Sequence, residues 1–165
     1  MTTPGILGEV VVRGQKIMRE YWRDPELTRS AIIDGWFRTG DLGFWDQQGF
    51  LCLVGRIRDV ITHWRTSLNV YCRLLDDFLP SLPGVRDAAA IGVPDESYGE
   101  AVYVFLVAYP GHRLSVATIR TRIVEELGPL YDPRGFSFLD TIPVTPVGKV
   151  DKKALRRLAF AGEAP

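Results

Sequence analysis

The chain has 165 residues, of which 46% are hydrophobic and 24% charged, a balance typical of a soluble globular protein and unlike that of a disordered or fibrous one. Its 20 basic and 20 acidic residues cancel, so the total charge favours neither nucleic acid nor a membrane surface as a partner. Because no apolar run is long enough to cross a bilayer and the N-terminus lacks a secretory pattern, we expect a cytoplasmic location and no membrane partner.

The first predicted element is a strand within residues 7–14, where a β-branched run lies between glycines. A short helical stretch is expected after Pro25, up to about Ile33. A strand at a chain start needs a neighbour to pair with. We therefore expect this chain to be a piece of a longer polypeptide whose further strands lie upstream.

Residues 34–54 predict a β-hairpin with its turn at residues 46–49. Within it, Asp41 lies between glycines after a strand, which is an exposed place for an acidic side chain. A carboxylate there can accept two hydrogen bonds from a vicinal diol such as a ribose, because it offers two oxygens and no competing donor. An aspartate that only stabilises the turn is the alternative that these residues leave open.

A domain boundary is expected near residues 55–59, where Arg56 and Arg58 share one side of an alternating segment that changes direction after Gly55. About a hundred residues remain after this boundary, which is a common size for a small domain. The patterns that follow predict a helix around residues 74–79, a hairpin of strands at 85–93 and 101–109, a helix from the N-cap Ser115 to Leu127, and a short strand at 136–139.

The last predicted feature is a loop that presents Lys149 at its tip. Pro146 stiffens the loop, and Gly148 permits backbone angles that other residues avoid. Asp151 is the expected N-cap of a final helix. In that helix we expect Ala154, Leu155 and Leu158 to face inward and Lys152, Lys153, Arg156 and Arg157 to face outward. By itself the loop also fits an ordinary surface turn with a solvated lysine.

The histidines and cysteines predict no special chemistry. His63 and His112 have no third ligand nearby, so we expect no metal site made by the protein. Cys52 and Cys72 lack metal-type spacing, and we expect both to be reduced, partly buried thiols. The basic face of the final helix has no interleaved aromatic residues, which favours a solvated surface over nucleic-acid binding.

Five motifs follow one another along the chain. They are Gly8-Glu9-Val10 with Tyr21 and Pro25–Thr28; Trp36–Asp41; Gly55–Asp59; Gly92–Asp95 with Gly99-Glu100; and Pro146–Val150 with Lys152. Together they resemble the C-terminal part of the adenylate-forming enzymes, the superfamily of acyl-CoA synthetases, non-ribosomal peptide synthetase adenylation domains and firefly-type luciferases. The resemblance covers almost the whole chain.

This resemblance implies an α+β fold in two parts. Residues 1–55 would form the β-rich, incomplete end of the large N-terminal domain. Residues 56–160 would form the compact C-terminal lid domain, a small sheet with flanking helices, and residues 161–165 a frayed tail. The family's phosphate-gripping loop, adenine site and acid pocket lie upstream of these motifs, so we expect the isolated chain to be inactive without that large domain.

The resemblance also implies a two-step ligase reaction. A carboxylic acid attacks the α-phosphorus of ATP, which would enter with Mg²⁺, and gives an acyl-adenylate and pyrophosphate. A thiol of coenzyme A, or of the phosphopantetheine arm of an acyl or peptidyl carrier protein, then takes the acyl group. In such an enzyme Asp41 would bind the ribose hydroxyls and Arg56 the nucleotide, Arg58 would be the hinge of domain alternation, and Lys149 would be the catalytic cation of adenylation.

The segment after the hinge departs from the family pattern. The family usually has a lysine at the position of Thr62 and a glycine pair soon after, whereas this loop contains His63, Trp64 and Arg65 and no glycine. In relatives the loop helps to form the tunnel for the pantetheine thiol. The resemblance therefore supports adenylation by this chain more strongly than it supports thioester formation. Trp64 could anchor the loop or gate the thiol path. A non-catalytic module that keeps the fold and binds a carrier protein or partner chain is the alternative function.

Overall fold

The computed structural model describes residues 3–63 and 67–161 and divides the chain into two compact units between Arg58 and Asp59. The first unit contains β1 (Gly8–Val12), α1 (Pro25–Ala31), β2 (Ile32–Ile33), β3 (Trp36–Trp45) and β4 (Leu51–Arg56). After a 3-10 turn at Ile57–Asp59, the second unit contains β5 (Val60–His63), β6 (Leu68–Tyr71), α2 (Cys72–Phe78), β7 (Val85–Asp95), β8 (Gly99–Ala108), α3 (Val116–Leu127), β9 (Gly135–Phe138) and α4 (Lys152–Ala161). The fold is therefore α+β, as the sequence predicted.

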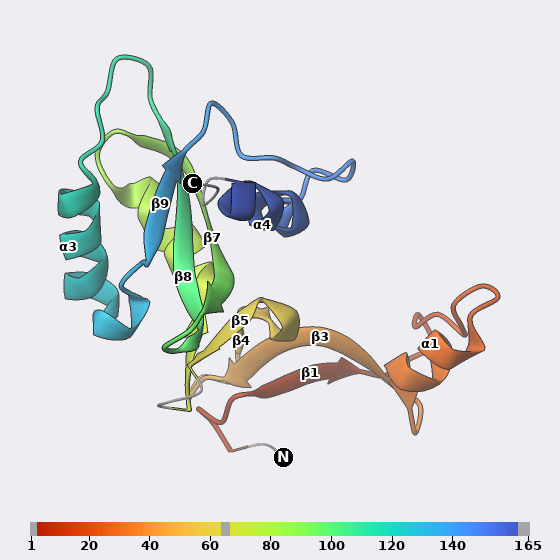
Figure 1. The fold of residues 1–165 in the computed structure, drawn as a ribbon. Coiled ribbons are helices and arrows are strands. Elements are labelled where there is room, and N and C mark those ends of the chain that lie inside the picture. The colour runs from red at the N-terminus through yellow and green to blue at the C-terminus, as the bar shows by residue number, and fades with distance from the viewer. Residues whose placement is uncertain (1–2, 64–66, 162–165) are drawn as a thin grey trace. The chain divides into compact units, whose positions relative to one another are not determined.

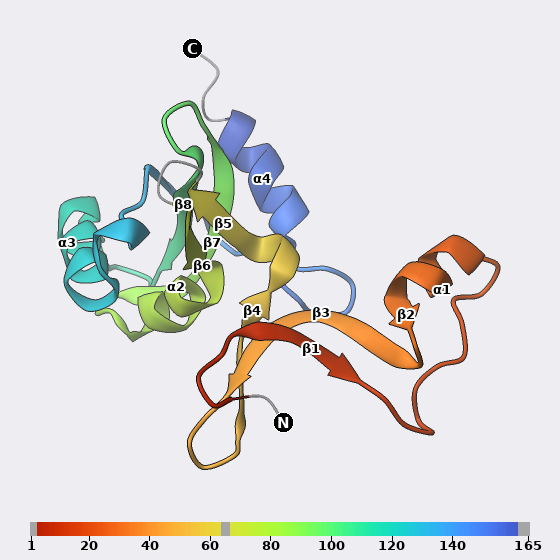
Figure 2. The same ribbon diagram turned by 90° about the horizontal axis from the view of Figure 1, so that it is seen from below.

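The first unit is an antiparallel sheet in which the long strand β3 pairs with β1, β2 and β4 (Figures 1 and 2). The predicted hairpin is present as β3 and β4. Its turn is held by Asp46, whose Oδ1 accepts hydrogen bonds from the backbone nitrogens of Gln48 and Phe50 at 2.9 and 2.8 Å. A short polar side chain that bonds its own turn in this way fixes where the strand reverses.

The first unit has almost no interior of its own. Among residues 3–58, only Gly43 is buried. Large apolar side chains of its strands stay exposed, including Trp45, Leu51 and Leu53 at 43%, 39% and 47% of their full exposure. A small sheet without a packed apolar face lacks the hydrophobic free energy that an independently stable domain needs.

The second unit is built on a three-stranded sheet in the order β7-β8-β9. β7 and β8 form the predicted antiparallel hairpin, and β9 pairs in parallel with β8 after a crossover through α3. Helix α3 lies on one side of this sheet and α4 on the other (Figures 1 and 2). Ser115 caps α3 as expected, since its side chain accepts a hydrogen bond from the backbone nitrogen of Thr118.

Residues along β7 alternate between two apolar clusters, because successive side chains of a strand point to opposite faces. Ala88 and Ala90 join a cluster that includes residues of α2 and α3. Ala89, Ile91 and Val93 join the cluster that contains Leu155 and Ala159 of α4. The second unit therefore has a core on both faces of its sheet. No helix within the described ranges combines the length and apolar character needed to cross a bilayer.

The segment after Gly55 differs from its prediction. We expected one strand or linker with Arg56 and Arg58 on the same side, but β4 ends at Arg56 and Arg58 lies in the 3-10 turn that follows. β5 and β6 then form a second hairpin whose Ile61 and Val70 enter the first apolar cluster. Sequence reasoning missed β6, because its four residues are too few for a clear alternating pattern.

Helix α4 corrects two predictions about its faces. Leu155 is fully buried as expected, but Leu158 is 44% exposed and Ala159 is buried in its place. Residues four apart share a helix face more closely than residues three apart. Ala159 therefore lies on the same buried face as Leu155, and Leu158 lies farther round the helix. Lys152, predicted to face solvent, has a side chain only 17% exposed because it pairs with Asp76.

Candidate functional site

Asp41 and Arg56 lie opposite each other on β3 and β4, and their side chains form an ion pair with 2.8 Å between Arg56 Nε and Asp41 Oδ1. The expectation that Asp41 occupies an exposed place after a strand is wrong. It lies within β3, and its side chain is 29% exposed. The structure thus joins the two residues that the family resemblance assigns to a nucleotide.

The backbone before Asp41 is held by a short network. The Thr39 hydroxyl donates to the Val10 carbonyl at 2.7 Å and accepts from the backbone nitrogen of Asp41 at 3.0 Å. Gly40 has a φ of +72°, which other residues rarely adopt, and its nitrogen donates to Glu9 Oε1 at 3.2 Å. The segment Thr39-Gly40-Asp41 therefore fixes the backbone position of Asp41, and it does so with a conformation at Gly40 that favours glycine.

The Asp41–Arg56 pair combines acceptors and donors in one place. A carboxylate has acceptor capacity for several donors, so Asp41 can bind a hydroxyl in addition to Arg56. The guanidinium has five N–H donors and carries a positive charge. Such a pair fits a ligand that carries both hydroxyl groups and negative charge.

Arg58 is exposed and is the last residue of the first unit. It belongs to the single-turn 3-10 segment at Ile57–Asp59, which separates β4 from β5. The chain therefore passes from one compact unit to the other at the residue to which the family resemblance assigns the hinge, and it does so without a long linker.

Thr62 and His63 lie at the end of β5. The Thr62 hydroxyl donates to Asn69 Oδ1 across the hairpin at 3.3 Å. His63 is buried, and its ring stacks on that of Tyr98 with 5.1 Å between centroids. Trp64 and Arg65, the other two residues of the predicted thiol-tunnel loop, lie outside the described residues.

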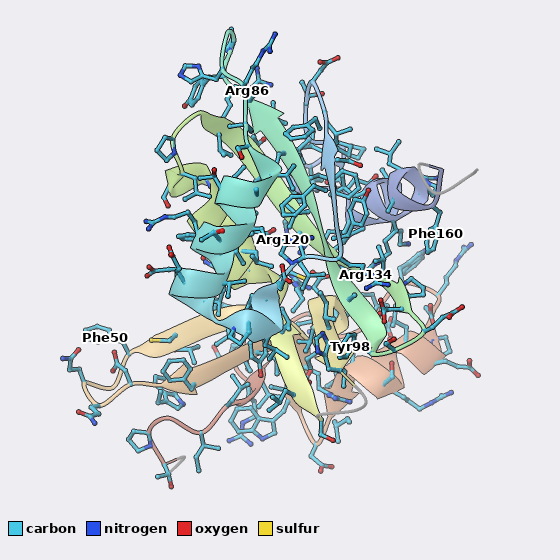
Figure 3. All side chains as sticks on the ribbon, turned by 60° about the vertical axis from the view of Figure 1, so that its left-hand side comes forward. Phe50, Arg86, Tyr98, Arg120, Arg134 and Phe160 are labelled. Atoms are coloured by element: carbon cyan, nitrogen blue, oxygen red, sulfur yellow. The ribbon has the colours of Figure 1, made fainter. Side chains whose placement is uncertain are left out.

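The turn that carries Tyr98 is held by Asp95, a contact that sequence reasoning missed. Asp95 Oδ1 accepts from the backbone nitrogens of Ser97 and Tyr98 at 2.8 and 3.0 Å, and its Oδ2 lies 3.3 Å from Arg134 Nε. Figure 3 shows Tyr98 and Arg134 near the same end of the β7–β8 hairpin. The aspartate directly after Pro94 was the sequence signal that could have revealed these hydrogen bonds to the turn.

Lys149 is exposed on a closed, hydrogen-bonded turn. The Thr145 nitrogen donates to the Lys149 carbonyl at 2.7 Å, and the Gly148 nitrogen donates to the Thr145 carbonyl at 2.8 Å. The Lys149 nitrogen donates to Thr145 Oγ1 at 3.2 Å. Gly148 has a φ of +77°, and Pro146 precedes it at the position where a turn favours proline. The turn presents the ammonium group to solvent on a defined backbone.

The turn is anchored where α4 begins. The Asp151 nitrogen donates to the Pro143 carbonyl at 2.8 Å. Its Oδ1 accepts from the nitrogens of Lys153 and Ala154 at 3.1 and 3.0 Å, which makes Asp151 the helix N-cap. The prediction of this cap is confirmed. Lys149 therefore lies two residues before the N-cap of α4.

Asp76 on α2 and Lys152 on α4 form a half-buried ion pair with 3.2 Å between Oδ2 and Nζ. Asp76 Oδ1 also accepts from the Ala90 nitrogen at 2.7 Å. Burial raises the pKa of Asp76 above its ordinary value, although Lys152 and the Ala90 hydrogen bond act in the opposite direction. No sequence signal could reveal this pair, whose members are 76 residues apart.

Neither the cysteines nor the acidic groups form a metal centre in the part of the chain that the structure describes, which holds no cluster of three or more His, Cys, Asp or Glu suited to a metal ion. Cys52 and Cys72 are free thiols. Burial raises the pKa of Cys72 to about 12, so this thiol is neutral and unreactive at physiological pH.

Comparison with known proteins gives a consistent result. Residues 75–149 match the AMP-binding enzyme C-terminal domain. The chain is 37% identical over 153 residues to a fatty acid–[acyl-carrier-protein] ligase of Streptomyces coeruleorubidus, which covers 93% of this chain and 29% of that protein. It is 38% identical over 152 residues to a sulfoacetate–CoA ligase of Cupriavidus necator, with 92% and 30% covered.

Among solved structures, the amide bond synthetase McbA of Marinactinospora thermotolerans superimposes with a TM-score of 0.88 at 41% identity, covering 95% of this chain and 32% of that one. The chain thus spans about a third of the length of the proteins it matches. Its fold is the one found in the C-terminal region of these enzymes.

Proposed function

We propose that this chain, which belongs to the adenylate-forming enzymes and carries their AMP-binding C-terminal domain, works as the lid and hinge portion of an ATP-dependent acid–thiol ligase. The observation that carries the proposal is the closed turn that presents Lys149 at the start of a capped helix. The large domain that binds most of the ATP and the acid is its partner.

In the first half-reaction an oxygen of the substrate carboxylate attacks the α-phosphorus of ATP. A new P–O bond forms, the bond to the β-phosphate oxygen breaks, and pyrophosphate leaves with its electron pair. Lys149 acts here as a compact cation that offsets the repulsion between the carboxylate and the phosphate as they approach. Its exposed place on a hydrogen-bonded turn supports this role, because the ammonium must reach a site formed by another part of the protein.

The nucleotide is assigned to the Asp41–Arg56 pair. Asp41 accepts hydrogen bonds from the ribose hydroxyls, and Arg56 fixes the carboxylate and adds positive charge beside the nucleotide. Mg²⁺ enters with the phosphates of ATP as part of the substrate.

In the second half-reaction the sulfur of a thiol attacks the acyl carbon, which forms the C–S bond of the thioester. The acyl C–O bond to the phosphate breaks, AMP leaves with the electron pair, and the thiol proton passes to solvent. We place the pivot between the two half-reactions at Arg58, and the division of the chain directly after this residue supports the assignment. The thiol belongs to coenzyme A or to the phosphopantetheine arm of a carrier protein. Both acceptor classes occur in the names of the relatives.

An amine acceptor is a second candidate for this half-reaction. The likeness to an amide bond synthetase at 41% identity favours it, together with the glycine-free loop at residues 62–65. The two acceptors are separated by supplying a preformed acyl-adenylate with either coenzyme A or a primary amine. Faster release of AMP with one of them identifies the acceptor.

The role of Lys149 is tested in the complete polypeptide that carries this sequence. A panel of carboxylic acids first identifies a substrate by ATP–pyrophosphate exchange. Lys149→Ala should then lower the exchange rate by about 100- to 1000-fold, the usual effect of removing one electrostatic contact to a transition state. Thiol transfer from a supplied acyl-adenylate should change far less.

Lys153→Ala is the matched control, because Lys153 is an exposed lysine on the neighbouring first turn of α4. Its exchange rate should equal that of the wild-type protein. An undiminished exchange rate in Lys149→Ala would refute the proposed role. A wild-type polypeptide that binds a carrier protein but exchanges no pyrophosphate with any acid would instead support the non-catalytic alternative.

A further inference from the structure

We propose that Asp76 and Lys152 form a positioning device for Lys149, which fixes the start of α4 and thereby the direction of the turn that presents the catalytic lysine. This inference rests on the proposed role of Lys149 in adenylation. Neither Asp76 nor Lys152 would touch the substrate, so both would act through the placement of Lys149.

Asp76 connects three elements of the second unit. Its Oδ2 lies 3.2 Å from Lys152 Nζ on α4, and its Oδ1 accepts from the Ala90 nitrogen of β7 at 2.7 Å. Asp76 itself belongs to α2, which packs on the same strand. One carboxylate thus joins the first residue of α4 to the rigid hairpin of the core.

The turn itself has little packing to fix it. Val144 and Val147 are 60% and 79% exposed, whereas Ile142, just before them, is buried in the apolar cluster that contains Leu155. The hydrogen bonds of the turn run among its own residues and to the backbone of Pro143. Its direction relative to the sheet is therefore set at two places, the entry at Ile142 and the exit at Lys152.

Lys152 is placed differently from the other basic residues of α4. Its side chain is 17% exposed, whereas Lys153 and Arg157 lie on the exposed side of the helix. A lysine in solvent keeps the conformational entropy of its flexible side chain, whereas a lysine held in an ion pair, such as Lys152, loses part of it. Burial also raises the pKa of Asp76, which means that the ionised carboxylate is held at a cost even with its partners in place.

A half-buried ion pair of this kind contributes little net stability compared with apolar residues of the same volume, but its hydrogen bonds favour one geometry. Apolar contacts of Leu155 and Ala159 already attach α4 to the sheet. The ion pair adds a directional constraint to these contacts, because Asp76 is itself held by the Ala90 hydrogen bond. The pair therefore supplies the precision of placement that a catalytic cation needs, since a shift of about 1 Å can lower a rate about 100-fold.

The test compares Lys152→Met with Lys153→Met in the complete polypeptide. Lys152→Met should lower the rate constant of adenylation by about 10- to 100-fold, with the KM for ATP and thiol transfer from a supplied acyl-adenylate changed by less than about three-fold. Lys152→Arg keeps the charge and should restore most of the rate. Lys153→Met should behave as the wild-type protein.

Hydrogen exchange on the 165-residue chain gives a second readout. In Lys152→Met, the amides of Gly148, Lys149 and Asp151 should exchange faster than in Lys153→Met, while those of β7 and β8 should keep their protection. Faster exchange throughout the sheet, with both half-reactions lowered alike, would mean that the pair only stabilises the fold, which overturns the inference. Unchanged turn amides and an unchanged adenylation rate would overturn it as well.

These outcomes are distinct from a failure of the proposed function. If Lys149→Ala leaves adenylation intact, the role of Lys149 is refuted, and the inference that this pair serves catalysis falls with it. If Lys149→Ala abolishes adenylation while Lys152→Met does not alter it, only the positioning role is refuted.

Discussion

Arg56 on β4 and Asp41 on β3 are direct cross-strand neighbours, and 2.8 Å separates Arg56 Nε from Asp41 Oδ1. The ion pair thus holds the carboxylate in one orientation. This orientation supports the proposal that the pair binds the ribose of a nucleotide.

Asp41→Asn should raise the KM for ATP in the complete polypeptide by roughly 10- to 100-fold, the range expected when hydrogen bonds to a charged group are lost. Pyrophosphate exchange measured against ATP concentration gives this value. Asp77→Asn is the control, because Asp77 forms an exposed ion pair with Arg73 on α2 and should leave the KM unchanged. Equal KM values for the two variants would contradict the nucleotide assignment.

Gly148→Ala should lower the adenylation rate through the shape of the Lys149 turn. Gly148 has a φ of +77°, where an L-residue costs about 1 kcal/mol, and a Cβ there would meet no other atom. Gly111→Ala is a matched control, because Gly111 has a φ of +78° and the same open surroundings. Both variants should lose about 1 kcal/mol of unfolding free energy. Only Gly148→Ala should lose adenylation, and a similar loss in Gly111→Ala would argue against a specific role of the turn.

Leu155→Ala should destabilise the chain by about 2–5 kcal/mol, since Leu155 is fully buried between α4 and the sheet. Leu158→Ala on the same helix should cost less than about 1 kcal/mol, because Leu158 is 44% exposed. Urea unfolding followed by circular dichroism measures both. Similar costs for the two variants would mean that α4 is rotated relative to the structure described above.

Cys72 should react with a thiol reagent such as DTNB only when the chain unfolds. Burial raises its pKa from 9.0 to about 12, which by itself lowers the thiolate fraction at pH 8 about 1000-fold. Cys52 is only partly buried and should react first. The two phases are assigned with Cys52→Ala and Cys72→Ala in native buffer and in urea. A fast native phase that survives in Cys52→Ala would refute the expectation.

Asp76 should make the stability of the chain depend on pH in a defined direction. Its pKa is raised above the ordinary 3.8 chiefly by burial, so the folded state holds the proton more tightly than the unfolded chain. The contribution of Asp76 to stability is therefore full below about pH 3.8 and is lost as the pH rises through the folded-state pKa.

Unfolding free energies of the wild-type chain and Asp76→Asn, measured from acid to neutral pH, test this expectation. The wild-type chain should lose stability relative to Asp76→Asn across that window, because asparagine does not titrate. A wild-type chain that gains stability relative to the variant as the pH rises would show that the attraction of Lys152 outweighs the cost of burial.

Local patterns predicted the elements whose signals lie within a few residues of one another. The β3–β4 and β7–β8 hairpins follow from apolar, strand-favouring runs on either side of polar turns, and Asp151 was recognisable as a cap from its place before a helical pattern. The turn of Lys149 was predictable for the same reason, since Pro146 restricts the backbone and Gly148 permits the positive φ of the turn. The order of five such motifs was enough to indicate the family.

The tertiary structure alone decided which distant groups meet. The pairing of Asp76 with Lys152 spans 76 residues, and it reverses the expected exposure of Lys152. The pairing of Asp41 with Arg56 depends on a register shift between Leu42 and Gly43, which brings Arg56 opposite Asp41. Periodicity indicates whether a residue faces a core or solvent, but it does not identify the residues that contact it in the folded chain. Burial and charge pairing are properties of those neighbours, so they appear only when the chain is folded.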